Sequence, residues 1–241
     1  MQRPLSKSMV GSGGGRGRWL RNRYWILRHG KSIPNEKGLI VSSMENGILA
    51  EYELAAQGVD QATLAGHSFK QILLETNTRL ENVRLCYSPF SRTTHTAKMV
   101  ASVLDIPFEG PQCKVMPELR ERYFGPSFEL KSHDKYTEIW DLDVKDPFLP
   151  PEGGESVADV VHRLTRALVS IESEFEECVV LIVSHGDPLQ ILQTMLKAAA
   201  AIEPAGEKED LVSRIEAITV PSILSKHRNY ALLTGELRSA A

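Results

Sequence analysis

The sequence has few cysteines, no long apolar run and no excess of positive charge. Its three cysteines, Cys86, Cys113 and Cys178, are odd in number and far apart, so a disulfide framework is not indicated. No window approaches the roughly 20 apolar residues that cross a membrane. The formal net charge of −3 argues against the broad basic surface of a nucleic-acid binder. We therefore expect reduced thiols, a cytoplasmic location, and neither a nucleic-acid nor a membrane partner.

The first 22 residues lack acidic side chains and have little apolar content. They combine several arginines with a glycine-rich run over residues 11–15. Such a segment cannot bury enough apolar surface to fold, so we predict a disordered basic tail over residues 1–22 and one domain over residues 23–241. A basic, serine-containing, acid-free segment is also typical of transit peptides. Import into an organelle is therefore the alternative to a cytoplasmic location, although an amphipathic stripe is missing.

Short apolar runs alternate with helical periodicity along the rest of the chain. This alternation predicts an α/β fold, a three-layer sandwich in which a mainly parallel sheet is flanked by helices. Ser156 and Asp159 form a capping-box pattern at the start of the clearest helix. The expected strands cover residues 24–28, 83–87, 179–184 and 230–233, and the expected helices cover 56–75, 92–104, 156–175 and 188–199.

Histidines and arginines follow three of the expected strands. Arg28 and His29 end the first strand, Arg92 begins the helix after the second, and His185 ends the third. A lone arginine is usually a solvated charge and a lone histidine is usually structural. Ligands of parallel sheets collect at the carboxyl ends of the strands, however, and histidine can accept a phosphoryl group while arginine matches phosphate oxygens. If the three strands are neighbours, these groups form one phosphate-sized site.

Five motifs in order make the sequence similar to the histidine phosphatase superfamily, in particular its phosphoglycerate mutase-like branch. The resemblance extends from Tyr24 to the last expected strand, and it implies the fold of that branch. The matching segments are residues 27–32 with Asn35, residues 88–97, residues 119–125, residues 153–156 and residues 183–186.

The resemblance implies a catalytic role for each of several residues. His29 is the expected nucleophile, forming a phosphohistidine, and Glu121 is the expected general acid and base, with Glu118 as its local competitor. His185 is expected to act in catalysis and to bind phosphate. The expected phosphate-binding residues are Arg28, Asn35, Arg92 and His185.

No metal or other cofactor is expected, because arginine and histidine can neutralise the phosphate charge. The five remaining histidines show no metal-ligand spacing with carboxylates or cysteines. They are His67, His95, His133, His162 and His227.

Three activities are open at this point. A phosphomonoester hydrolase is favoured, a mutase-type phosphoryl transferase (an isomerase) is the alternative, and a non-catalytic module that binds a phosphorylated ligand is the third. Asp141 and Asp143 follow Trp140, where the family's mutases have arginines, and acid there would repel a substrate carboxylate. We expect a small phosphorylated metabolite or a phosphoprotein as substrate, with a homodimer as an open possibility. Lys31, where the family usually has glutamate or glutamine, could favour substrates with extra negative charge.

Overall fold

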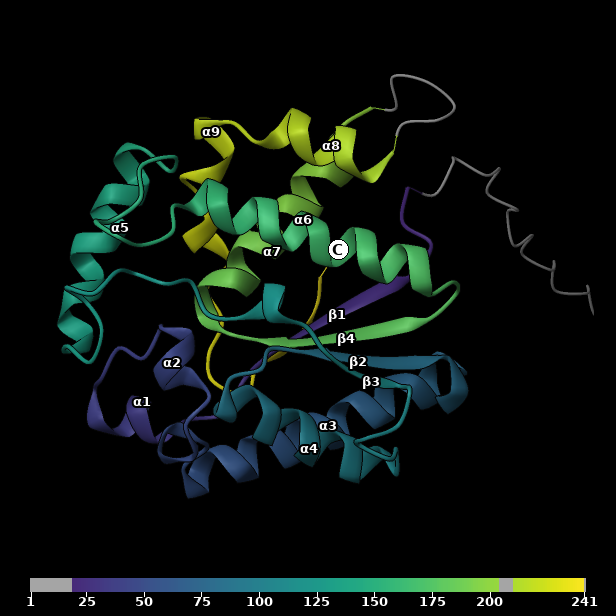
Figure 1. Cartoon of the computed structure of the whole chain (residues 1–241). Helices are drawn as coiled ribbons and strands as arrows, with labels where there is room; N and C mark the ends of the chain where they lie inside the picture. Colours follow the sequence, from purple (N-terminus) through teal and green to yellow (C-terminus); the bar gives the residue numbers. More distant parts are fainter. Residues whose placement is uncertain (1–18, 204–209, 241) are drawn as a thin grey trace, which may run out of the picture.

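A sheet of five strands lies between two layers of helices in this computed structural model, which describes residues 19–203 and 210–240 (Figure 1). The strand order is β3-β2-β4-β1-β5, with β5 antiparallel to β1 and the other pairs parallel. The predicted α/β sandwich with a mainly parallel sheet is therefore confirmed. The strands are β1 (Arg23–Arg28), β2 (Val83–Tyr87), β3 (Cys113–Val115), β4 (Val179–Ser184) and β5 (Leu237–Ser239).

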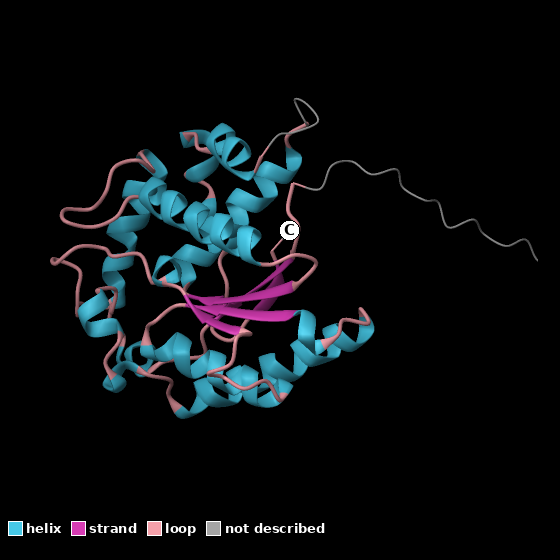
Figure 2. Ribbon diagram, turned by 45° about the vertical axis from the view of Figure 1, so that its right-hand side comes forward, coloured by secondary structure: helices cyan, strands magenta, loops and turns pink. Residues whose placement is uncertain are grey.

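The helices cover both faces of the sheet. In Figure 1, α6, α7 and α8 lie above it, and α3 and α4 lie below it; Figure 2 shows the strands enclosed between the two layers from another angle. The helices are α1 (Ile33–Lys37), α2 (Met44–Gly47), α3 (Ala56–Glu75), α4 (Ser91–Leu104), α5 (Tyr136–Lys145), α6 (Val157–Glu174), α7 (Gly186–Ala201), α8 (Leu211–Ile218) and α9 (Pro221–Leu224), and the 3₁₀ turns are η1 (Ala50–Tyr52), η2 (Leu80–Asn82), η3 (Pro117–Leu119), η4 (His133–Lys135) and η5 (His227–Tyr230).

Two hydrophobic cores form because side chains of a strand point alternately to the two faces of the sheet. In the central strand β4 all six residues are buried, with Ile182 in the core beneath α6 and α7 and Val183 in the core against α3 and α4. A strand buried on both faces explains why this segment is a continuous apolar run. The sheet thus gives the site a rigid base.

Helix α6 shows how local sequence signals fix an element. Ser156 Oγ accepts the backbone N–H of Asp159 at 3.0 Å, and the Asp159 carboxylate accepts the backbone N–H of Ser156 at 2.8 Å. These reciprocal bonds satisfy two of the N–H groups that the first helical turn leaves free. The predicted capping box is confirmed, and the apolar stripe of α6 packs on the sheet.

The strand predicted over residues 230–233 is wrong. Tyr230 ends the 3₁₀ turn η5, Leu232 is buried, and Leu233 is 78% exposed. The Leu232 carbonyl accepts a hydrogen bond from Arg28 Nη1 at 2.6 Å, instead of one from a neighbouring strand. The last strand is β5, which has no apolar run because it forms an edge of the sheet. Strand β3 and helices α5 and α8 were also not predicted.

Residues of the predicted tail already pack against the domain, before the predicted domain start at residue 23. Residues 1–18 of the predicted tail lie outside the described residues. Leu20 is buried, and the Asn22 amide donates to the Glu172 carboxylate at 3.0 Å and to the Phe175 carbonyl at 2.9 Å. The chain therefore packs against α6 before β1 begins.

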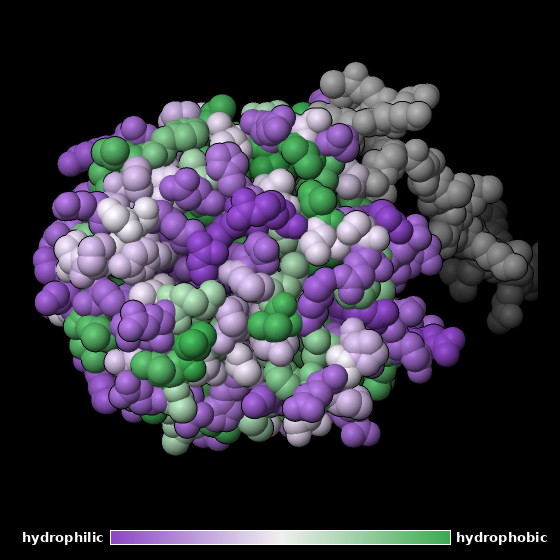
Figure 3. Space-filling model, in the orientation of Figure 1, coloured by the Kyte–Doolittle hydropathy of each residue, from purple (hydrophilic) through white to green (hydrophobic). Residues whose placement is uncertain are grey.

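Across the described segments, no helix combines the length and apolar character needed to span a membrane. On the face shown in Figure 3, apolar residues lie in small groups among hydrophilic ones.

Candidate active site

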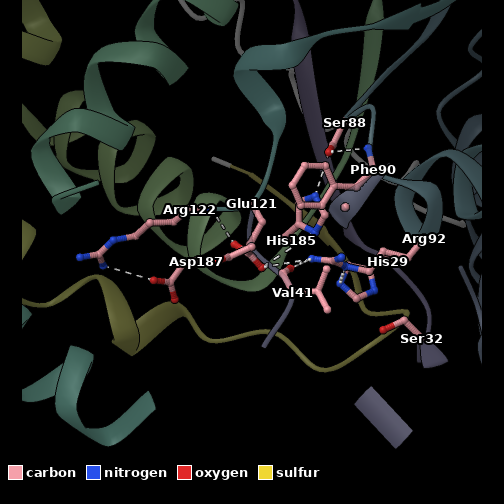
Figure 4. A network of polar contacts seen from close by, with 12 residues as sticks. His29, Ser32, Val41, Ser88, Phe90, Arg92, Glu121, Arg122, His185 and Asp187 are labelled. Atoms are coloured by element: carbon pink, nitrogen blue, oxygen red, sulfur yellow. Dashed lines mark hydrogen bonds and ion pairs between the residues drawn. The ribbon is translucent and has the colours of Figure 1, made fainter. Parts of the chain in front are cut away.

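The carboxyl ends of β2, β4 and β1 meet at one end of the sheet, where α1, α2 and α5 also lie (Figure 1). Arg28 is paired in register with Ser184, and Tyr87 with Val183. Since these three strands are adjacent, the residues that follow them come together. The predicted convergence of His29, Arg92 and His185 is therefore confirmed (Figure 4).

The protonation of His29 follows from its two hydrogen bonds. Arg92 Nε donates to His29 Nε2 at 3.1 Å, and a guanidinium can only donate. The Nε2 atom must therefore carry a lone pair, and the ring proton lies on Nδ1, which donates to the Gly30 carbonyl at 2.7 Å. Burial, followed by the charges of Arg92 and Arg28, holds the pKa of His29 well below its usual range. The ring is thus neutral, and its Nε2 atom carries the free lone pair.

His185 presents the opposite arrangement of donor and acceptor. Its Nε2 lies 2.8 Å from Ser88 Oγ, and that oxygen already accepts the backbone N–H of Phe90 at 3.3 Å. We assign the Ser88 hydroxyl as donor to Nε2, which leaves the proton of His185 on Nδ1. The two imidazole rings are 5.2 Å apart between centroids. His185 Nδ1–H therefore faces the site as a neutral donor.

Three buried nitrogens around His29 have no hydrogen-bond partner among the described residues: Arg28 Nε, Arg92 Nη1 and His185 Nδ1. The rest of each guanidinium is anchored, since Arg92 Nη2 donates to the Val41 carbonyl at 2.9 Å and Arg28 Nη1 donates to Leu232. An unpaired buried donor costs free energy. These free N–H groups of two arginines and a histidine can donate to the oxygens of an anion such as phosphate.

Glu121 lies beside these donors. Its Oε1 accepts the backbone N–H of Arg122 at 2.9 Å, while its Oε2 is 3.9 Å from both Arg92 Nη2 and His185 Nδ1. Burial and the nearby Asp187 carboxylate raise the pKa of Glu121 to about 7. A carboxyl group that titrates near neutral pH can donate and accept a proton in turn. Glu118, its local competitor, is not among the residues that line the cavities at this site.

Asn35 lies at the site, but its side-chain oxygen is bound to Ser32. Its Oδ1 accepts from the backbone N–H of Ser32 at 3.0 Å and from Ser32 Oγ at 2.9 Å, which closes the capping box of α1. The amide nitrogen has no partner in the described part of the chain and lines the same cavity as Arg28. Asn35 is therefore positioned as a further donor.

Gly30 is required by packing between two backbones. A Cβ atom at Gly30 would lie 2.2 Å from the Gly58 carbonyl oxygen, and one at Gly58 would lie 2.0 Å from the Lys31 carbonyl oxygen. Both glycines thus allow α3 to contact the loop after β1. The contact with α3 is therefore the reason that a glycine stands at position 30.

Two cavities that share lining residues, among them Arg28 and Glu121, open at the site. The smaller, of about 30 Å³, is lined by His29, Arg92 and Glu121, and the larger, of about 490 Å³, is lined by residues that include Tyr136 and Arg228. The larger volume is typical of a pocket for a small organic ligand. The chain thus offers an anion site and an adjoining space for the rest of a substrate.

Several lining residues were missed by sequence reasoning. His133, Tyr136 and Arg228 all line the larger cavity, and His133 Nε2 donates to the Leu39 carbonyl at 2.8 Å. They come from η4, α5 and η5, segments that follow no strand directly. No motif in the sequence marks them, because loop packing alone brings these segments over the sheet end.

Arg122 belongs to a buried ionic cluster with Asp187, which lines the larger cavity. Its guanidinium donates to both Asp143 oxygens at 2.7 and 2.8 Å and to Asp187 at 3.3 Å, and His227 Nε2 lies 3.6 Å from Asp143. Two carboxylates and a histidine can form a metal site. Here the guanidinium already engages both carboxylates, so this cluster does not suit a cation.

The same contacts change the significance of the acidic residues after Trp140. Asp143 is fully buried against Arg122, and Asp141 is exposed and lines neither cavity. The expected repulsion between these aspartates and a substrate carboxylate is therefore wrong. The prediction arose because a sequence shows charge but not the partner that neutralises it.

Solved structures similar to this one share its fold. They include an open reading frame product from Mycobacterium tuberculosis (23% identity, 90% of this chain and 89% of that chain, TM-score 0.59). They also include the mycobacterial glucosyl-3-phosphoglycerate phosphatase (21% identity, 89% and 90%, TM-score 0.58) and mycobacterial hydrolase 1 (19% identity, 89% and 86%, TM-score 0.58). Among curated proteins, no sequence matches the chain.

The sequence profile of the histidine phosphatase superfamily (branch 1) matches residues 24–205, which contain the three strand ends described above. This match covers most of the chain and agrees with the resemblance found from its motifs. The chain belongs to branch 1 of the histidine phosphatase superfamily and is an enzyme of the phosphatase or mutase type.

Proposed function

We propose that the protein is a metal-independent phosphomonoester hydrolase that acts through a phosphohistidine on His29. The observation that carries the proposal is the neutral His29 ring, whose Nε2 accepts from Arg92 while buried donors of Arg28, Arg92 and His185 are left without partners. A nucleophile and an anion site thus occupy the same point.

In the first step His29 Nε2 attacks phosphorus as the ester P–O bond breaks. Arg28, Arg92 and His185 donate to the phosphoryl oxygens and neutralise their charge, as phosphoryl transfer requires. Glu121 Oε2 gives its proton to the leaving oxygen. Arg92 Nε must leave His29 Nε2 as phosphorus approaches, and it can then donate to a phosphate oxygen.

In the second step water attacks the phosphohistidine. The Glu121 carboxylate takes the proton of that water, the P–N bond breaks, and inorganic phosphate leaves with His29 neutral again. The 490 Å³ cavity beside Glu121 offers room for water once the alcohol has left. Hydrolysis is also the activity named for mycobacterial glucosyl-3-phosphoglycerate phosphatase.

The test is to trap the intermediate. Wild type and His29→Asn are mixed with a phosphoester labelled in its phosphoryl group, in the presence of a chelator, and quenched in denaturant. We expect acid-labile, alkali-stable label on the wild-type protein and none on His29→Asn, together with release of inorganic phosphate. Turnover that survives in His29→Asn, or is abolished by chelator, would overturn the proposal. A phosphorylated isomer in place of free phosphate would assign the mutase reaction instead.

A further inference from the structure

Arg228 is a cation in the wall of the larger cavity that no described residue neutralises. Its guanidinium carbon lies 3.5 Å from the centre of the Trp140 ring, and the side chain is half-buried. No hydrogen bond or ion pair joins the guanidinium to any described residue. Since the indole covers one face of the planar group, its N–H edges are left for a different partner.

The carboxylates that interact electrostatically with Arg228 already bind other groups. Asp187 and Asp143 are the carboxylates that attract Arg228 electrostatically. Both bind the guanidinium of Arg122, and Asp187 also accepts a hydrogen bond from the Gln190 amide at 2.7 Å. Burial lowers the pKa of Arg228 despite these carboxylates. A partly desolvated cation costs free energy unless an anion pairs with it. The wall is therefore suited to an anionic ligand.

Arg228 shares its cavity with the proposed phosphate site. Arg28 lines both cavities, and its bond to the Leu232 carbonyl ties it to the segment that carries Arg228. Tyr136 and Trp140 form a stacked aromatic wall of the larger cavity, with 4° between their rings. A substrate whose phosphate is at His29 can lie along this wall and bring its other end to Arg228.

We propose that Arg228 forms a second anion-binding subsite, which selects phosphomonoesters whose organic part carries a further carboxylate or phosphate group. This inference rests on the proposed function, because it places the first phosphate at His29. Lys31 lines the same cavity, and among the described residues its ammonium donates only to the uncharged Gln57 amide oxygen, at 3.1 Å, so it adds positive charge on that side.

The test compares substrates that differ in one anionic group. Glycerol 3-phosphate is paired with 3-phosphoglycerate for the carboxylate, and fructose 6-phosphate with fructose 1,6-bisphosphate for the second phosphate. In at least one pair, wild type should have the higher kcat/KM for the member with the further anionic group. In Arg228→Met, which keeps the apolar stem on Trp140, this preference should fall about 10- to 100-fold, the loss expected for charge-assisted hydrogen bonds. The pair that responds identifies carboxylate or phosphate as the ligand group.

Arg166→Met is the matched control. Arg166 is exposed on α6 and lines neither cavity, so its removal changes the net charge by the same amount without touching the subsite. We expect its preference to equal that of wild type. A wild type that favours the member without the further anionic group in both pairs, or an Arg228→Met variant with unchanged preference, would overturn the inference.

Equilibrium binding separates this inference from the proposed function. The His29→Asn protein is titrated with 3-phosphoglycerate and fructose 1,6-bisphosphate, alone and combined with Arg228→Met. At least one of the two ligands should bind about 10- to 100-fold more weakly when Arg228 is replaced, whether or not His29 is the nucleophile. Equal affinities for both ligands in the two proteins reject the subsite, whereas turnover in His29→Asn rejects only the mechanism.

Discussion

Arg92 Nε donates a hydrogen bond to His29 Nε2 at 3.1 Å. The bond joins the first turn of α4 to the residue after β1 and leaves Nε2 as the unprotonated nitrogen of the imidazole. Burial lowers the pKa of His29, and the positive charge that Arg92 places beside Nε2 lowers it further, so the ring stays unprotonated. In the proposed mechanism, Arg92 therefore keeps the His29 ring neutral before the reaction and binds the phosphoryl group once phosphorus takes its place.

Replacing Arg92 by lysine tests this double role. Lysine keeps the charge but cannot contact His29, the Val41 carbonyl and a phosphate oxygen at once. We expect kcat/KM for p-nitrophenyl phosphate to fall about 10²- to 10³-fold, as when one transition-state donor is removed. Arg166→Lys on the exposed side of α6 is the control for the exchange itself. A loss within about threefold would show that charge alone suffices at this position.

Replacing Glu121 by glutamine tests the proton donor. Alkyl phosphates have a poor leaving group that needs the proton, so we expect their turnover to fall about 10²- to 10⁴-fold. Turnover of p-nitrophenyl phosphate should fall much less, because its leaving group is stable as an anion. Glu118→Gln, three residues earlier and outside both cavities, should act like wild type. Equal losses on the two substrate classes contradict the assignment of Glu121.

The pH dependence follows from the pKa of Glu121, which burial and the Asp187 carboxylate raise to about 7. In the proposed mechanism protonated Glu121 is the acid, so kcat/KM for an alkyl phosphate should decline above about pH 7. Asp187→Asn removes a negative charge that disfavours ionisation of Glu121, so the pKa falls and the decline should begin at lower pH. Asp141→Asn, exposed on α5, is the control. A profile that stays in place or moves to higher pH contradicts the coupling of the two carboxyl groups.

Replacing Asp143 by alanine tests how much its buried pair with Arg122 contributes to the stability of the fold. Asp143 and Arg122 are both fully buried and share two hydrogen bonds, so Asp143→Ala leaves the guanidinium short of a partner. Removing one member of a buried pair costs about 3–5 kcal/mol, and we expect this loss in the free energy of unfolding measured with urea. Asp141→Ala, exposed two residues earlier, should stay within about 0.5 kcal/mol of wild type. A change of that small size for Asp143→Ala would show that the pair contributes little.

Elements with their own local signals could be predicted from the sequence. The bounds of α3 and β2 agree with the prediction, because α3 has helical periodicity and β2 is a short apolar run between turns. Elements without such a signal were missed. Strand β3 has three residues and β5 pairs only at an edge, so both depend on the strand beside them.

The catalytic residues proposed here follow strands, and that is why motifs could find them. Arg228 and Tyr136 could not be found in this way, since they lie on segments that no strand positions and reach the cavity only through packing. Nor could the aspartates after Trp140 be interpreted without their partner. Asp143 binds Arg122, which precedes it by 21 residues in the chain.

The sequence by itself determined the alternation of strands and helices and the residues that end the strands, because periodicity and strand-end motifs are local properties. Tertiary structure decided which charges are paired. It turned Asp143 inward to Arg122, left Arg228 stacked on Trp140 without an ionic partner among the described residues, and buried Glu121 so that its pKa rises toward neutrality. Charge pairing and burial depend on distances between segments far apart in the chain, so only the folded arrangement fixes them.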